Sequence, residues 1–267
     1  MKSGTDKRTL QIGAKKPVLT MKHGWLLFFG IIYITSIMLG VFAAKSKILG
    51  AINYFCLVLC FVYVLNAGFL SKKLVNKKAE LLEKLKIYRN FMLLFAFLMV
   101  LVSDAILTFD HTSIVGVLTF CFVQIFHLAR IIWTNKLSFI LFMLDVVIVA
   151  VLWWQGAPLI YIFGFIYACM ILSNLYFAWK NVLNKENDNK SIATQKRWLI
   201  ALGFSLFLFC DICVLISYLS GVTNVLLSEI QPYFNFFAWV FYMPAQIMLA
   251  MSVEDMGCVK NSDSTKF

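Results

Sequence analysis

Eight apolar runs of about 20 residues each dominate this chain, and they decide what it can fold into. A helix of that length matches the thickness of a bilayer, and the runs lack the apolar-polar alternation of a barrel strand. Helical membrane spans are therefore predicted at Trp25 to Ala44, Gly50 to Leu70, Phe91 to Phe109, Ser113 to Trp133, Leu137 to Trp154, Pro158 to Trp179, Trp198 to Leu219 and Tyr233 to Val253.

The composition excludes an ordinary soluble protein. Of the 267 residues, 61% are hydrophobic and only 14% are charged. We therefore expect an all-α, polytopic membrane helix bundle with about eight transmembrane helices. Its predicted parts are a basic cytoplasmic segment over residues 1–23, a transmembrane domain over 24–253 and a cytoplasmic tail over 254–267.

The net charge of +11 reports topology rather than a nucleic-acid partner, because the basic residues fall in alternate loops. They gather in the N-terminal segment, in the loop from Lys72 to Arg89 and in the loop from Lys180 to Arg197. Only Lys45 and Lys47 fall on the other side. The positive-inside rule then puts both termini in the cytoplasm. We expect a multi-pass protein of a bacterial-type plasma membrane.

Two aspartates, Asp104 and Asp211, lie inside predicted spans, where a carboxylate is costly. Each occupies the third helix of its half, roughly 20 Å from the cytoplasmic end at about 1.5 Å per residue. The next helix of each half carries a glutamine, Gln124 and Gln246 respectively. A 4+4 tandem repeat would produce this pattern.

Few other polar residues lie in the spans. Gln124 and His127 are three residues apart on one helical face, and Asn174 lies in the sixth span. In the last span a stripe at helical spacing is predicted to face the bundle interior; it consists of Asn235, Trp239, Tyr242 and Gln246. Pro244 frees the carbonyl of Val240, which then needs another donor.

Charged residues near the inner face allow further predictions. Asp145 is a candidate partner for Arg130 or His127, and Arg130 is expected to extend toward lipid phosphates. The segment from Leu74 to Tyr88 is either an amphipathic helix on the inner leaflet or a solvated connector.

Physical chemistry leaves three functions open for the two aspartates. Burial favours the neutral form of a carboxyl, and two neighbouring carboxyls strengthen that tendency. A protonated carboxyl serves as a general acid in an enzyme. It equally serves a proton-coupled transporter, or a purely structural hydrogen bond between helices.

Short motifs favour the first of these three functions, because they resemble motifs of the lysoplasmalogenase (YhhN-like) integral membrane family. They are Phe97 to Leu107, then Gly116, Phe120, Phe122 and His127-Leu128, then Gly203 to Leu215, then Tyr242 with Ala245-Gln246. The chain departs from the family pattern where Ser103 replaces a usual Gly, Cys210 a common Ser and Arg130 a common aromatic residue.

The resemblance implies hydrolysis of the vinyl ether bond of lysoplasmalogens, with Asp104 and Asp211 as the catalytic pair. Water or the headgroup would be oriented by substrate-binding residues, namely Gln124, His127, Asn174, Tyr242 and Gln246. The partners would be a lysophospholipid substrate and membrane lipids. No metal or organic cofactor is expected, since Cys210 and Cys213 form a CxxC inside a helix without a second ligand pair.

Overall fold

The computed structural model describes residues 21–42, 47–70, 80–109, 113–132, 147, 151, 154–156, 158–183, 191–223 and 231–254. Within these residues there is no strand, and seven helices are long and apolar enough to cross a membrane. This confirms the predicted all-α membrane bundle. The helices are α1 (Met21–Phe42), α2 (Lys47–Leu65, continued by a π-helical turn at Asn66–Leu70), α3 (Glu80–Phe109), α4 (Ile114–Ile132), α6 (Leu159–Leu183), α7 (Ser191–Thr223) and α9 (Gln231–Met251).

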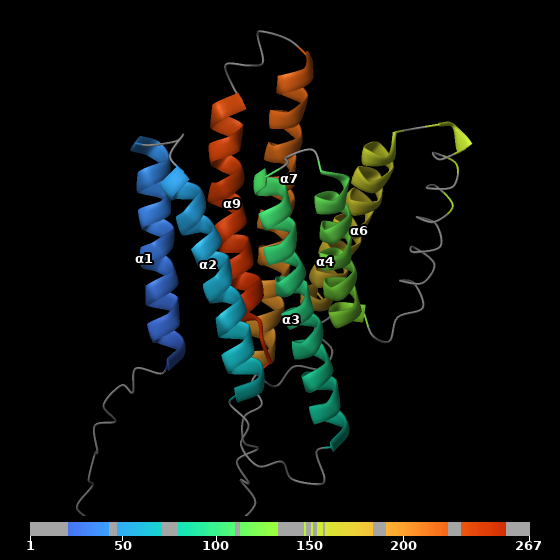
Figure 1. The fold of residues 1–267 in the computed structure, drawn as a ribbon. Helices are drawn as coiled ribbons and strands as arrows, with labels where there is room; N and C mark the ends of the chain where they lie inside the picture. Colours follow the sequence, from blue (N-terminus) through green and yellow to red (C-terminus); the bar gives the residue numbers. More distant parts are fainter. Residues whose placement is uncertain are drawn as a thin grey trace, which may run out of the picture.

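The predicted fifth span, Leu137 to Trp154, lies almost wholly outside the described residues, as does Asp145. Helices α4 and α6 lie side by side and run in the same direction (Figure 1). The end of α4 and the beginning of α6 are therefore at opposite faces of the bundle.

Helix α3 is longer than the predicted third span. The segment predicted as a separate surface helix or connector is, from Glu80 onward, the first part of α3, and residues 71–79 lie outside the described residues. Leu, Glu and Lys are strong helix formers, so the charged stretch before Phe91 continues the apolar helix instead of breaking it.

Six helices, α2, α3, α4, α6, α7 and α9, form a closed ring: each packs on the next, and α9 packs back on α2. Helix α1 lies outside the ring, against α2 and α9. In the predicted numbering these are spans 2, 3, 4 and spans 6, 7, 8. Each contact between two ring helices therefore has a counterpart four spans along, which is the packing that a 4+4 tandem repeat predicts.

The same positions of α3 and α7 face the inside of the ring. Counted back from each aspartate, buried residues occur one, four, seven and eight positions earlier. In α3 these are Ser103, Val100, Phe97 and Ala96, and in α7 they are Cys210, Phe207, Phe204 and Gly203. The two aspartates thus share a register within their helices.

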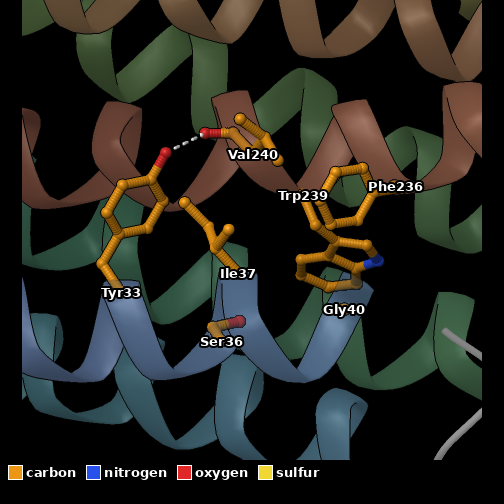
Figure 2. A pocket seen from close by; sticks show the side chains of 7 residues that line it. All are labelled: Tyr33, Ser36, Ile37, Gly40, Phe236, Trp239 and Val240. Carbon is orange, nitrogen blue, oxygen red and sulfur yellow. Dashed lines mark hydrogen bonds between the residues drawn. The ribbon is translucent and has the colours of Figure 1, made fainter. Parts of the chain in front are cut away.

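Helix α1 is joined to α9 at the proline. The Tyr33 hydroxyl donates to the Val240 carbonyl at 2.9 Å, beside a small crevice between the two helices (Figure 2). Pro244 has no N–H for that carbonyl, so the tyrosine replaces the missing helical donor. The expectation that another donor satisfies Val240 is confirmed.

Candidate functional site: two carboxyl-tyrosine pairs inside the helix ring

Asp104 on α3 accepts a hydrogen bond from the Tyr242 hydroxyl of α9 at 2.7 Å. The Tyr242 ring is buried and stacks on Phe207 of α7, with ring centroids 5.6 Å apart. The structure thus brings together two residues that the sequence placed in separate halves. A hydroxyl that donates to a carboxyl oxygen fixes the orientation of the carboxyl group.

Asp211 on α7 has the same kind of partner from another helix. The Tyr167 hydroxyl of α6 donates to its Oδ2 at 2.8 Å. Sequence reasoning missed Tyr167, because one tyrosine among the many aromatic residues of the spans gives no signal by itself. Its position seven residues before Asn174 was the available clue, since that spacing puts both side chains on one helical face.

The two carboxyl-tyrosine pairs are neighbours. Phe120 packs edge-on against Tyr167 and contacts Phe207, with centroid distances of 5.9 and 6.4 Å, and Phe207 stacks on Tyr242. The thiol of Cys210, next to Asp211, interacts electrostatically with both carboxyls. Among the described residues each carboxyl is bonded to its tyrosine and not to the other carboxyl.

A layer of buried amides lies beyond the carboxyl-tyrosine pairs, toward the end of the bundle at which α6 and α9 end. The Asn174 Nδ2 of α6 donates to the Gln124 Oε1 of α4 at 2.8 Å and to the Gln124 backbone carbonyl at 3.0 Å. Both side chains are fully buried. Asn174 shares one face of α6 with Tyr167, so the amide layer lies on the same side of α6 as the Asp211 pair.

His127 and Gln246 complete this layer. His127 is buried and packs edge-on against Phe204, with ring centroids 5.2 Å apart. Among the described residues, the side-chain hydrogen bonds of the two aspartates go to Tyr242 and Tyr167 and not to His127. Four buried polar atoms of the layer have no hydrogen-bond partner among the described residues; they are Gln124 Nε2, His127 Nδ1, Asn174 Oδ1 and Gln246 Oε1. Buried polar atoms of this kind are usually paired, so the layer is suited to hold water or a polar group of a ligand.

The stripe predicted on the last span faces the interior only in part. Tyr242 and Gln246 are buried, whereas Asn235 is exposed and Trp239 lines the crevice against α1. The prediction is wrong for Asn235 and Trp239, because both side chains are exposed in the first half of α9, Trp239 beside α1 and Asn235 beside α7. Asn235 accepts a hydrogen bond from Ser217 of α7.

No group of three His, Cys, Asp or Glu side chains that could hold a metal ion occurs in the described part of the chain. Cys210 and Cys213 are both free there.

A family model described as the YhhN family matches residues 56–253. The chain belongs to this family. The match begins inside α2 and ends just after α9, so it covers the helix ring and leaves out α1. The chain has no match among curated proteins or solved structures.

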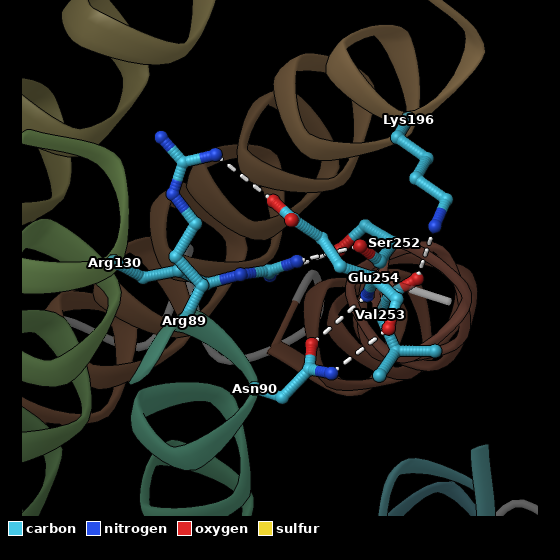
Figure 3. A network of polar contacts seen from close by, with 7 residues as sticks. All are labelled: Arg89, Asn90, Arg130, Lys196, Ser252, Val253 and Glu254. Atoms are coloured by element: carbon cyan, nitrogen blue, oxygen red, sulfur yellow. Dashed lines mark hydrogen bonds and ion pairs between the residues drawn. The ribbon is translucent and has the colours of Figure 1, made fainter. Parts of the chain in front are cut away.

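Arg130, where this YhhN chain departs from the family pattern noted above, does not extend to lipid phosphates. It is buried, and its guanidinium donates to the Ser252 hydroxyl at 2.9 Å and to the Ser252 carbonyl at 2.6 Å (Figure 3). The prediction of a snorkelling side chain is wrong because Ser252, which follows the end of α9, offers a carbonyl and a hydroxyl as partners inside the bundle.

Three further residues hold the same end of α9. Asn90 of α3 bonds both the backbone N–H and the carbonyl of Glu254, at 2.9 and 2.8 Å. Arg89 forms an ion pair with the Glu254 carboxylate at 2.9 Å, and Lys196 of α7 donates to the Val253 carbonyl at 2.7 Å (Figure 3). We call Arg89, Asn90, Arg130, Lys196, Ser252, Val253 and Glu254 the inner cap. It fixes α9, and with it Tyr242, relative to α3, α4 and α7.

Proposed function

We propose that this protein is an integral membrane hydrolase that cleaves the vinyl ether bond of lysoplasmalogens. The products are a fatty aldehyde and glycerophosphoethanolamine or glycerophosphocholine. Membership of the YhhN family, which is the lysoplasmalogenase family, supports a membrane hydrolase at the level of the family. The observation that carries the proposal is the pair of neighbouring carboxyls, Asp104 and Asp211, each oriented by a tyrosine inside an apolar bundle.

Two such carboxyls are sufficient for the chemistry. One protonated carboxyl gives its proton to the alkenyl carbon remote from the ether oxygen, and the neighbouring carbon becomes an oxocarbenium ion. The second, ionised carboxyl stabilises that cation and takes a proton from the water that attacks it. The resulting hemiacetal collapses to aldehyde and alcohol. Glycosidases use a pair of carboxyls in the same way on a related cation.

The amide layer has an auxiliary role in this proposal. Gln246, His127 and Asn174 each keep an unpartnered polar atom beside the carboxyl-tyrosine pairs, and these atoms would orient water or the headgroup. Tyr242 and Gln124 would act through the groups that they bond. A single-chain lipid would reach the site from the membrane, between two helices. The reaction as written needs no cofactor.

A proton-coupled transporter of small solutes or lipids is the second candidate, favoured by the repeat-like ring with acids at matching positions. The two functions separate experimentally. A transporter moves its solute or proton across proteoliposomes without releasing aldehyde. A hydrolase releases aldehyde in detergent, where there are no two aqueous compartments.

The test incubates purified protein with lysoplasmenyl-ethanolamine and lysoplasmenyl-choline and measures aldehyde release. Asp104→Asn and Asp211→Asn should each lower the rate about a hundredfold or more, because each removes a proton-transfer group. Asp263→Asn, the same change outside the transmembrane domain, should leave the rate unaltered. Full activity in both site variants would overturn the mechanism, and an inactive wild type would overturn the substrate.

A further inference from the structure

The two hydroxyl groups that line the crevice between α1 and α9 are both bonded to protein atoms. The Tyr33 hydroxyl donates to the Val240 carbonyl (Figure 2). The Ser36 hydroxyl donates to the Asn53 side chain of α2. The other side chains that line the crevice are aliphatic or aromatic; they belong to Ile37, Phe236 and Trp239. This lining suits an alkyl chain, which needs no hydrogen-bond partner.

The crevice is continuous with the candidate site through Trp239. This side chain lines the crevice and packs edge-on against Tyr242, with ring centroids 5.7 Å apart. The Tyr242 hydroxyl in turn bonds Asp104. One aromatic side chain therefore lies between the crevice and the first carboxyl-tyrosine pair.

The amide layer has the opposite character. Asn174 Nδ2 donates to the Gln124 backbone carbonyl, which can only accept, so the atom of the Asn174 amide left without a partner is its oxygen. Gln246 Oε1 is a second buried acceptor, and Gln124 Nε2 a buried donor, that have no partner among the described residues. A hydroxyl group both donates and accepts hydrogen bonds, so these atoms together suit a hydroxyl of a ligand.

Along α9 the crevice, the carboxyl partner and the amide layer follow one another. At about 1.5 Å per residue, Trp239 precedes Tyr242 by about 4.5 Å and Gln246 follows it by about 6 Å. Trp239 and Gln246 are seven residues apart, which puts them on one face of the helix. In a lysoplasmalogen the alkyl chain, the vinyl ether bond and the free glycerol hydroxyl follow one another in the same order.

The inner cap adds a charge difference in the same direction. It lies beyond the amide layer, where α9 ends. Its cations outnumber its acids, since it contains Arg89, Arg130 and Lys196 and one carboxylate, that of Glu254. A phosphate attached to the glycerol is attracted toward this end of the bundle.

We infer that a single-chain ether lipid lies along α9 in one direction. Its chain lies in the crevice between α1 and α9, its vinyl ether beside Asp104 and its glycerol hydroxyl in the amide layer. Helix α1 lies outside the ring, so it can move aside for the chain while the ring contacts stay intact. The identity of the lipid rests on the proposed function, whereas the direction rests on the crevice, the amide layer and the inner cap.

Two photoreactive lipids test the direction in the full-length protein in lipid nanodiscs. Both have a saturated ether in place of the vinyl ether, so neither is cleaved. The chain probe carries a diazirine on the part of the chain nearest the ether, and the headgroup probe carries it on the headgroup. Labelled residues are identified by mass spectrometry.

The chain probe should label residues 33–40 and 236–240, and this label should saturate. At Leu172, which is exposed on α6, the label should rise in proportion to the probe. The headgroup probe should label α9 from Gln246 onward. Equal labelling of the crevice by both probes, or a crevice label that does not saturate, overturns the inference.

Filling the crevice tests the place of the chain. Gly40 is buried and lines the crevice, so Gly40→Phe puts a ring where the chain should lie. The crevice label and aldehyde release from a hexadecenyl lipid should both fall about tenfold. A butenyl analogue, whose chain is too short to fill the crevice, should be hydrolysed at an unaltered rate.

Gly30→Phe is the matched control, because an added Cβ at Gly30 on the same helix meets nothing within 4 Å. It should change neither the label nor the rate. Equal losses for the two lipids in Gly40→Phe, or no loss, overturn the crevice as the chain site. The wild-type labelling decides the direction by itself if Gly40→Phe does not fold.

Removing one amide oxygen tests the place of the glycerol hydroxyl. Gln246→Leu should raise the concentration for half-maximal labelling by the chain probe about tenfold, because the hydroxyl loses an acceptor. A chain probe without this hydroxyl should bind the wild type more weakly and should not be weakened further by Gln246→Leu. Gln231→Leu, the same change at the first residue of α9, should affect neither probe. An equal loss for both probes in Gln246→Leu overturns the placement of the hydroxyl.

The labelling result and the aldehyde assay fail independently. The expected labels without aldehyde release would keep the direction of the lipid and lose the proposed hydrolysis. Aldehyde release with reversed labels would keep the hydrolase and lose the direction.

Discussion

The helix pairs α3–α4 and α7–α9 occupy corresponding places in the ring and carry an aspartate and a glutamine on corresponding turns. They differ at the positions that follow the glutamine. Three and six residues after the glutamine, α4 has His127 and Arg130, whereas α9 has Leu249 and Ser252. Arg130 bonds Ser252, so the two corresponding positions are each other's partners. The two halves are alike at the level of the aspartates and complementary at the end of the bundle where Arg130 bonds Ser252.

The largest expected difference between the halves is in the inner cap. Arg130→Leu removes two charge-assisted hydrogen bonds and should lower the free energy of unfolding by about 3 kcal/mol. Ser252→Ala should cost only about 1 kcal/mol, because its carbonyl still accepts from Arg130. Unfolding in mixed detergent micelles measures both values. Equal costs would mean that the cap depends on the serine hydroxyl as much as on the arginine.

The next difference concerns the glycines at which the helices of each pair meet. A Cβ on Gly116 would lie 2.5 Å from a methyl carbon of Leu107, whereas one on Gly203 would lie 3.0 Å from Leu249. Gly116→Ala should therefore cost about 2 kcal/mol and Gly203→Ala less than about 1 kcal/mol. In a Leu107→Ala background the Gly116→Ala cost should fall. An unchanged cost there would show that the side-chain clash is not the cause.

The smallest expected effect distinguishes α9, which contains a proline, from α4, which does not. Tyr33→Phe leaves the Val240 carbonyl without its donor and should cost about 1 kcal/mol. Pro244→Ala restores a backbone N–H for that carbonyl, so the tyrosine change should cost less in that background. A double-mutant cycle on thermal unfolding in detergent measures the coupling. Additive effects would contradict the replacement of the helical donor by Tyr33.

The sequence was sufficient to predict the seven spans that the described residues contain, because long apolar runs are characteristic of membrane helices. It also singled out the two aspartates with their glutamines, because charged residues are rare and costly in such runs. It did not reveal Tyr167, since a tyrosine in an aromatic-rich span is unremarkable until its hydroxyl has a partner. The burial of Arg130 was also missed. Its partners are the hydroxyl and the carbonyl of Ser252 at the end of another helix, and no spacing along the chain predicts such a contact.

The ring closes where α9 packs on α2, and α9 is synthesised long after α2 and α3. The hydroxyl that bonds Asp104 belongs to a residue 138 positions later in the chain. While the earlier spans insert, the Asp104 carboxyl has no Tyr242 to bond, and in an apolar surrounding a carboxyl is most cheaply kept neutral. Asp104 would then be protonated while the chain is still on the ribosome, before its bond to Tyr242 can form.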